Sequence, residues 1–261
     1  MKTKTNKFIR RFFVTLLVIS HSFPAFASGY DGIFFLGFNM EKEPFNSVYV
    51  RQAVAHAVNL KTIVNLASAE VTPGSVIPPG MAGYQKELLP YSFDLKQAKV
   101  LMRRGKYLPV NPKLKKISLL HTDGVKTIAI AKEIQNNLRA IGIKANLVQV
   151  KYQNELKWNE ELLSRRHHLY LFGYKADLMA SLSQEAAPDV ADTYKLLDPL
   201  FHSKGAVNLN GFNNSTVDML LDQVSVIGYT YQMERNIKLK EVNKVLYQEL
   251  PALVLFYIPK L

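Results

Sequence analysis

The chain has 261 residues with a formal charge of +12, from 33 lysines and arginines against 21 aspartates and glutamates, and it contains no cysteine. Without cysteine there are no disulfides, thiolate metal sites or cysteine nucleophiles, so apolar burial must supply the stability. The basic residues are scattered, apart from KLKK at 113–116, and do not alternate with aromatics. We therefore expect no nucleic-acid partner.

Residues 1–27 have the composition of a secretory signal peptide. MKTKTNKFIRR carries five cations and no acid, FFVTLLVIS is an apolar run too short to span a bilayer, and AFAS offers small residues to a signal peptidase. We predict cleavage after Ala27, which removes the five cations and lowers the charge to +7; an uncleaved anchor is the alternative. With no cysteine after the cut to carry a lipid, we expect a periplasmic product without stable membrane insertion.

The first part of the mature chain predicts a strand followed by helices. GIFFLGFNM, residues 32–40, is short and aromatic, as buried strands are. A helix begins at Asn46 or Ser47 and is broken at Asn59, before a short helix over 61–67. The prolines and glycines of 72–84 predict an irregular loop, and the next helix begins near Ser92 or Asp94 and stops at Gly105.

The rest of the chain alternates between strand and helix patterns. KISLLHT, VKTIAIAKEIQNNLRAIG and IKANLVQVK form a βαβ unit, and NELKWNEELLSRR and HHLYLFGY add a helix and a strand. Two amphipathic helices and the strand PALVLFYIPKL complete the sequence. We predict an α/β fold with a mixed sheet flanked by helices, in one domain, because no repeat or linker interrupts the pattern.

Motifs for catalysis and metal binding are absent from the sequence. There is no H-E-x-x-H, no G-x-S-x-G, no phosphate loop and no G-x-G-x-x-G. His167 and His168 are adjacent, so on a strand they point to opposite faces, and the helical neighbours Glu160 and Glu161 diverge. Trp158 is most simply a core residue. We predict no enzyme activity, no metal and no cofactor.

The order of several segments resembles the family 5 extracellular solute-binding proteins, the oligopeptide, dipeptide and nickel receptors of ABC importers. The similar segments cover nearly all of residues 33–258, and they are FNMEKEPFNSVYVRQAVAHAVNLKTIV, IPPGMAGY, FDLKQAKVLMRRGKY, AKEIQNNLRAIGIKANL, NLNGFNNSTVDMLLDQ and ERNIKLKEVNKVLYQELPALVLF. Members of this family are usually much longer, and their first half has no counterpart here. The resemblance therefore implies that residues 28–261 form a single lobe, the second, of a periplasmic-binding-protein-like type II fold.

The resemblance also implies a ligand-binding corner. In the family's peptide receptors, a Gly-Trp-x-Ala-Asp segment supplies an acid for the α-ammonium group of the ligand, and here GYKAD is similar to it. Asp177 would hold the ammonium, with Tyr174, Lys175 and Ala176 beside it, although Tyr174 replaces the usual tryptophan. A helix N-cap is the alternative role for Asp177.

Two other charged residues in the similar segments have plainer roles. We expect Arg51 and Asp218 to make structural ion pairs or caps.

These features predict an exported, non-enzymatic module related to peptide ABC import. A single lobe would bind a peptide or small cationic solute weakly, unless a permease or another protein covers its exposed and apolar face. The alternative is a periplasmic sensor or regulatory subunit that uses the former cleft face as a protein interface. A gene remnant is a third reading, which the preserved helix patterns argue against.

Overall fold

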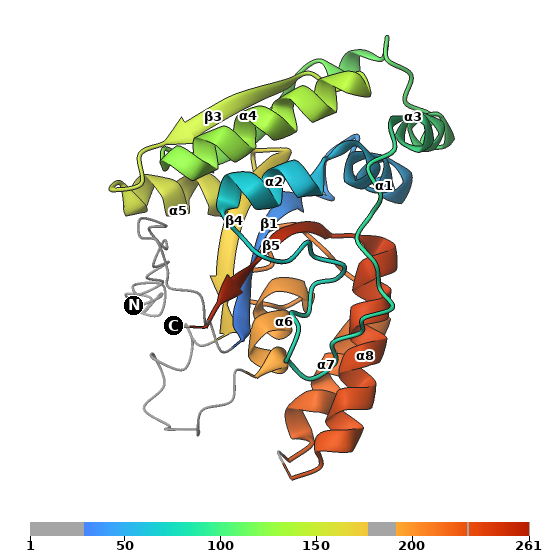
Figure 1. Ribbon diagram of the computed structural model, residues 1–261, viewed down its shortest axis with the longest axis vertical. Coiled ribbons are helices and arrows are strands. Elements are labelled where there is room, and N and C mark those ends of the chain that lie inside the picture. The colour runs from blue at the N-terminus through green and yellow to red at the C-terminus, as the bar shows by residue number, and fades with distance from the viewer. Residues whose placement is uncertain (1–28, 177–191, 229, 261) are drawn as a thin grey trace, which may run out of the picture.

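The computed structural model describes residues 29–176, 192–228 and 230–260. The described strands form one mixed sheet in the order β3-β2-β4-β1-β5 (Figure 1). β2 is parallel to β3 and β4, whereas β1 is antiparallel to β4 and β5. The carboxyl ends of β2, β3, β4 and β5 therefore lie at one edge of the sheet, here called the carboxyl edge. The strands are β1 (Tyr30–Phe38), β2 (Ile117–Thr122), β3 (Ala145–Val150), β4 (Leu169–Lys175) and β5 (Ala252–Pro259).

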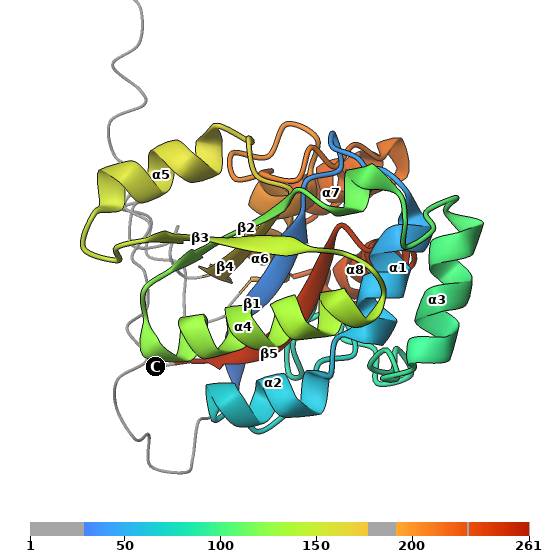
Figure 2. The same ribbon diagram turned by 90° about the horizontal axis from the view of Figure 1, so that it is seen from above.

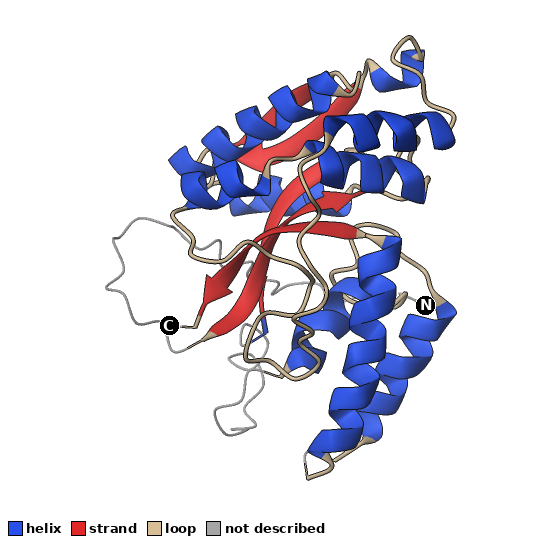
Figure 3. Cartoon of the chain, turned by 45° about the vertical axis from the view of Figure 1, so that its right-hand side comes forward, coloured by secondary structure: helices blue, strands red, loops and turns tan. Residues whose placement is uncertain are grey.

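Helices cover both faces of the sheet, giving three layers (Figures 2 and 3). One apolar core joins the sheet to α1 (Val48–Ala57), α2 (Leu60–Ala67), α3 (Leu95–Arg104) and α4 (Val125–Ala140). The other joins it to α5 (Glu155–Leu163), α6 (Thr193–Phe201), α7 (Ser215–Val226) and α8 (Gln232–Glu249). A short 3-10 turn spans Pro112–Leu114. None of the described helices is long and apolar enough to cross a bilayer.

β1 supplies side chains to both cores because successive residues of a strand point to opposite faces. Ile33 and Phe35 belong to the core under α5–α8, and Leu36 and Phe38 to the core under α1–α4. Gly37 is required where β1 passes β4, since a Cβ there would overlap the ring of Tyr170.

Local sequence signals place most element boundaries correctly. Asn59 ends the first helical stretch and accepts a hydrogen bond from Thr62 N, and Asp94 accepts from the first turn of α3. β1 runs over Tyr30–Phe38 rather than 32–40, a shift of two residues. The sequence patterns assign nothing to α6, because Pro199 lies inside it and interrupts the helical pattern.

The predicted loop at 72–84 is irregular and packs against α8. Asn236 Oδ1 accepts from Gly83 N at 2.6 Å, and Asn243 Nδ2 donates to Gly83 O at 3.2 Å. The Tyr257 hydroxyl of β5 donates to Ser75 O at 3.0 Å. The loop therefore joins α8 to β5.

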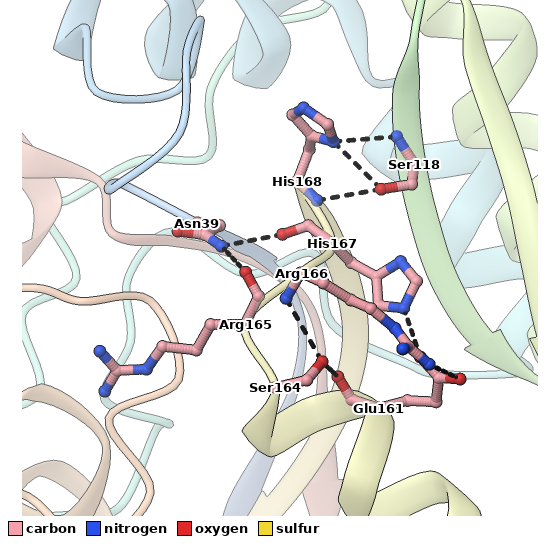
Figure 4. Close-up of polar contacts among 8 residues, drawn as sticks. All are labelled: Asn39, Ser118, Glu161, Ser164, Arg165, Arg166, His167 and His168. Carbon is pink, nitrogen blue, oxygen red and sulfur yellow. Dashed lines mark hydrogen bonds and ion pairs between the residues drawn. The ribbon is translucent and has the colours of Figure 1, made fainter.

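A polar junction closes the end of α5 against the start of β4 (Figure 4). Glu161 Oε2 lies 2.8 Å from His167 Nε2 and accepts a hydrogen bond from Arg166 Nε at 2.6 Å. These two bonds, outweighing the opposing effect of burial, lower the pKa of Glu161 to about 2. The His167 ring is therefore already in contact with the carboxylate of Glu161, which belongs to the same segment of the chain.

The neighbouring histidine turns the other way. His168 Nδ1 lies 3.0 Å from Ser118 Oγ on β2, while Asn39 Nδ2 donates to His167 O at 2.9 Å (Figure 4). The two histidines therefore have separate partners, as expected for adjacent residues. Within the described ranges no three acidic or histidine side chains gather closely enough to hold a metal ion.

We predict that Glu161→Gln destabilises the protein at pH 7 by about 1–3 kcal/mol, because it weakens the bonds to Arg166 and His167. A folded-state pKa below the ordinary value of a glutamate means that this stabilisation is present at neutral pH and is lost as pH falls from near 4.5 toward about 2. Urea unfolding of the parent and the variant across pH 3–7 should show a stability difference that narrows on acidification.

The matched control for this experiment is Glu160→Gln, since Glu160 is exposed on the same helix. It should change stability by less than about 0.5 kcal/mol at any pH. A difference between the parent and Glu161→Gln that does not vary with pH would contradict the assignment.

Candidate functional site

The carboxyl edge of the sheet is the candidate site, since ligands of open α/β sheets bind beyond the carboxyl ends of the strands. β2, β3, β4 and β5 end there at Thr122, Val150, Lys175 and Pro259, and β1 begins there at Tyr30. The predicted residues Tyr174, Lys175 and Ala176 lie at the end of β4, so the structure brings these three to this edge. Asp177, the fourth, lies outside the described residues.

Tyr174 is buried, with 3% of its surface exposed, and its hydroxyl has no hydrogen-bond partner among the described residues. Burial raises the pKa of Tyr174 to about 12, and the negative charge of Asp198 on α6 adds to the effect. The hydroxyl therefore stays protonated at neutral pH. A buried hydroxyl without a partner costs free energy, so Tyr174 keeps an unused capacity to donate at the end of β4.

Lys175 forms an ion pair with Asp31 on β1. Lys175 Nζ lies 3.1 Å from Asp31 Oδ2, and the two side chains are 10% and 1% exposed. Buried charges require such pairing, so Lys175 and Asp31 depend on each other and join β4 to β1. Ala176 is also buried. The structure thus places all three residues beneath the surface of the edge, and their contact with a solute remains a prediction.

Asp31 was not singled out from the sequence. The sequence does contain a signal for Asp31, because it is an acid at the start of the aromatic run YDGIFF. A carboxylate in a buried strand needs a cation as its partner. Beside Asp31, Tyr30 packs its ring against Tyr257 of β5, with centroids 5.6 Å apart. The pKa of Tyr30 is raised, first by burial and then by the charge of Glu70 and a hydrogen bond with it.

A second buried ion pair lies among the helices on the α5–α8 side. Arg235 Nη2 lies 3.2 Å from Asp192 Oδ1, and both side chains are nearly buried. The same guanidinium donates to the carbonyls of Val224 and Ile227, so it also secures the end of α7. This pair fixes α8 against the residue that precedes α6.

Two large apolar side chains are exposed close to the carboxyl edge. Val125 opens α4 directly after β2, and Leu156 lies in the first turn of α5 after β3; each is 85% exposed. Single exposed apolar residues are common on protein surfaces. Two of them following the ends of neighbouring strands give this edge an apolar character.

Two small cavities among the described residues lie away from Tyr174, Lys175 and Ala176. One, of about 20 Å³, lies between the 73–76 loop, α8 and β5, and the other, of about 10 Å³, lies beside Glu161 and His167. A volume of this size admits about one water molecule. Neither can enclose a peptide.

Arg51 and Asp218 have the structural roles expected of them. The Arg51 side chain is buried and donates to the carbonyls of Phe45, Glu249 and Leu250, which caps the end of α8. Burial lowers the pKa of Arg51 to about 10, so it remains charged at neutral pH. Asp218 Oδ1 accepts from Ser203 N at 2.8 Å. The capping role expected of Arg51 is confirmed, and Asp218 makes a structural hydrogen bond to the segment after α6.

Comparison with known proteins gives relatives that are receptors. Heme-binding protein A of Haemophilus influenzae is 27% identical over 228 residues, which cover 83% of this chain and 38% of the relative. The dipeptide-binding protein of Escherichia coli is 27% identical over 146 residues, covering 55% of this chain and 27% of the relative. The chain thus spans well under half of the length of these relatives.

Solved structures show the same fold. HbpA2 from Haemophilus parasuis superimposes with a TM-score of 0.73 at 20% identity, covering 87% of this chain and 42% of the other. The periplasmic binding protein DppA from Helicobacter pylori, in complex with the peptide STSA, has a TM-score of 0.70 at 22% identity and covers 88% and 43%. This likeness confirms the predicted α/β fold, with a mixed sheet flanked by helices as in periplasmic binding proteins.

The model of the middle region of the bacterial extracellular solute-binding proteins, family 5, matches residues 16–203. This match spans most of the chain, and it agrees with the relatives and with the fold. The chain therefore belongs to family 5 of the bacterial extracellular solute-binding proteins, a family of binding proteins and not of enzymes.

Proposed function

We propose that the protein is an exported module that binds a peptide or a small cationic solute in connection with ABC import. The observation that carries the proposal is the carboxyl edge, where four strands end together and Tyr174 holds an unused hydroxyl. Family membership and the named ligands of the relatives, heme and dipeptides, support a solute-binding role. The signal-like composition of residues 1–27 supports a periplasmic location.

The proposed binding is weak or dependent on a partner, with residues 28–261 acting as one lobe. High affinity for a small ligand requires that most of its surface be buried, and the cavities beside α8 and beside Glu161 hold about one water each. A solute on the carboxyl edge would stay in contact with water unless another protein covered it. A permease or a protein that supplies the opposite face would raise the affinity by excluding that water.

A sensor or regulatory subunit is the second candidate function. Val125 and Leu156 favour it, because exposed apolar side chains suit a protein partner better than a charged solute. Lys175 favours it too, since its charge is already engaged by Asp31 and a ligand carboxylate would have to compete. In this role the carboxyl edge would bind a protein and no peptide.

We predict that residues 28–261 bind free di- and tripeptides with a dissociation constant of about 1 mM or weaker, measured by calorimetry.

Asp177→Ala should reduce the heat of binding without lowering the melting temperature, because the carboxylate is proposed to contact the ligand and not to cap a helix. Asp177→Asn is the matched control: an amide can still cap a helix but cannot pair with an ammonium. A micromolar constant for the parent would refute the half-site argument, and a lowered melting temperature for Asp177→Ala alone would favour capping.

We predict that a photocrosslinking amino acid placed at position 125 or 156 forms adducts with one and the same protein in intact cells. The matched control is position 110, since Val110 is 82% exposed and lies near the opposite edge of the sheet. A membrane-embedded transporter subunit as the product would support import, and a periplasmic or sensor protein would support regulation. Equal adduct yields at 110 and at 125 would contradict a partner at the carboxyl edge.

A further inference from the structure

β3 is an edge strand whose outer side is open to another strand. Lys144 O accepts from Ile117 N at 3.3 Å and Val150 O accepts from Asp123 N at 3.1 Å, so the even-numbered residues direct their backbone groups toward β2. The odd-numbered residues 145, 147 and 149 therefore direct theirs outward. The Gln135 amide donates to Ala145 O at 2.7 Å. No described strand lies on this side of β3 (Figure 2).

The usual protections of an edge strand are missing along β3 itself. Its sequence, ANLVQV, contains no charge and no proline, and six consecutive residues pair with β2 in register without a bulge. β5, at the other edge of the sheet, differs because all of its residues except the last are buried. β3 is therefore the exposed template for strand addition in the described part of the chain.

Apolar side chains on both faces of β3 are only partly covered. Leu147 packs at the margin of the core under α1–α4, and Val148 at the margin of the core under α5–α8. Both are intermediate in exposure. A strand added beside β3 would cover the two side chains at once, in addition to pairing the outward backbone groups.

An exposed lysine lies at each end of β3, and these two charges determine which kind of strand can bind beside it. Lys144 precedes β3 and Lys151 follows it. A second copy paired antiparallel about Leu147 would bring the end of β3 that carries Lys144 beside the end that carries Lys151 in the other copy, twice by symmetry. Two cations would then lie close together at each end of the paired strands. Like charges at such positions are unfavourable, whereas an acid at each end of the incoming strand is favourable.

We propose that the open edge of β3 binds an extended segment of another protein, rich in β-branched residues and flanked at both ends by aspartate or glutamate. The segment adds a sixth strand to the sheet through the outward backbone groups of residues 147 and 149, since the outward carbonyl of Ala145 already accepts from Gln135. Its side chains on one face cover Leu147 and those on the other face cover Val148, and its acids pair with Lys144 and Lys151. This surface runs along the outer side of β3 and meets the carboxyl edge at Lys151, and the proposal does not depend on the identity of the solute.

The test uses residues 28–261 and two synthetic peptides with the same centre, acetyl-Glu-Thr-Val-Thr-Val-Thr-Val-Glu-amide and its lysine-flanked counterpart. Hydrogen exchange of individual amides is followed by NMR during titration with each peptide. The acid-flanked peptide at saturation should slow the exchange of the Leu147 and Gln149 amides at least about tenfold. The lysine-flanked peptide should leave the exchange rates of these two amides unchanged. In 0.5 M salt, the acid-flanked peptide at a concentration that gives low occupancy should also leave them unchanged.

Two pairs of variants separate backbone pairing from charge. Gln149→Pro removes an outward N–H at an exposed position without removing a bond to β2, so it should abolish protection of Leu147, whereas Gln149→Ala should retain it. Lys144→Glu combined with Lys151→Glu should reverse the preference toward the lysine-flanked peptide. Lys99→Glu, an equally exposed lysine on α3, should leave the preference unchanged.

Several results would overturn the proposal. Equal protection by both peptides would remove the role of the lysines, and no protection by either, with the parent folded, would remove the edge as a site. A concentration-dependent dimer in sedimentation, with the Leu147 and Gln149 amides protected in the absence of peptide, would make a second copy the occupant. In that case the partner would be the chain itself and not another protein.

Discussion

The position of β1 is the constraint on which the rest of the structure depends. β1 runs antiparallel between β4 and β5, and it pairs with both along nearly its full length. It therefore joins the parallel β2-β3-β4 unit to the C-terminal strand, although β1 and β5 lie at opposite ends of the described sequence. The side chains of β1 point to both faces of the sheet. Ile33 and Phe35 therefore lie in one core, and Leu36 and Phe38 lie in the other.

Two buried charge clusters make this arrangement specific. The Lys175–Asp31 pair joins β4 to β1 at the carboxyl edge, and Arg51 binds the carbonyls at the end of α8, just before β5 begins. Removal of a partner from a buried charged group is strongly destabilising. Part of the polar chemistry at the candidate site is therefore committed to structure, which limits what remains for a solute.

The two surfaces proposed for binding differ in their physical character. The carboxyl edge combines a buried tyrosine hydroxyl with the exposed side chains of Val125 and Leu156, and it suits a ligand or partner that brings its own polar groups. The β3 edge offers the outward backbone groups of residues 147 and 149, which pair with no described strand, between two lysines, and it suits an extended segment flanked by acids. The two surfaces meet at the carboxyl end of β3, where Lys151 lies.

The sequence by itself determined the order of most helices and strands, the break at Asn59 and a helix start near Ser92 or Asp94, because periodicity and capping depend on residues within about four positions of each other. The order of its motifs determined the family. It missed α6, where Pro199 obscures the helical pattern. Only the tertiary structure decided the strand order, the ion pair of Lys175 with Asp31, and the separate partners of His167 and His168. These contacts join residues far apart in the chain or depend on side-chain direction, so they follow from strand register and packing, which local patterns do not encode.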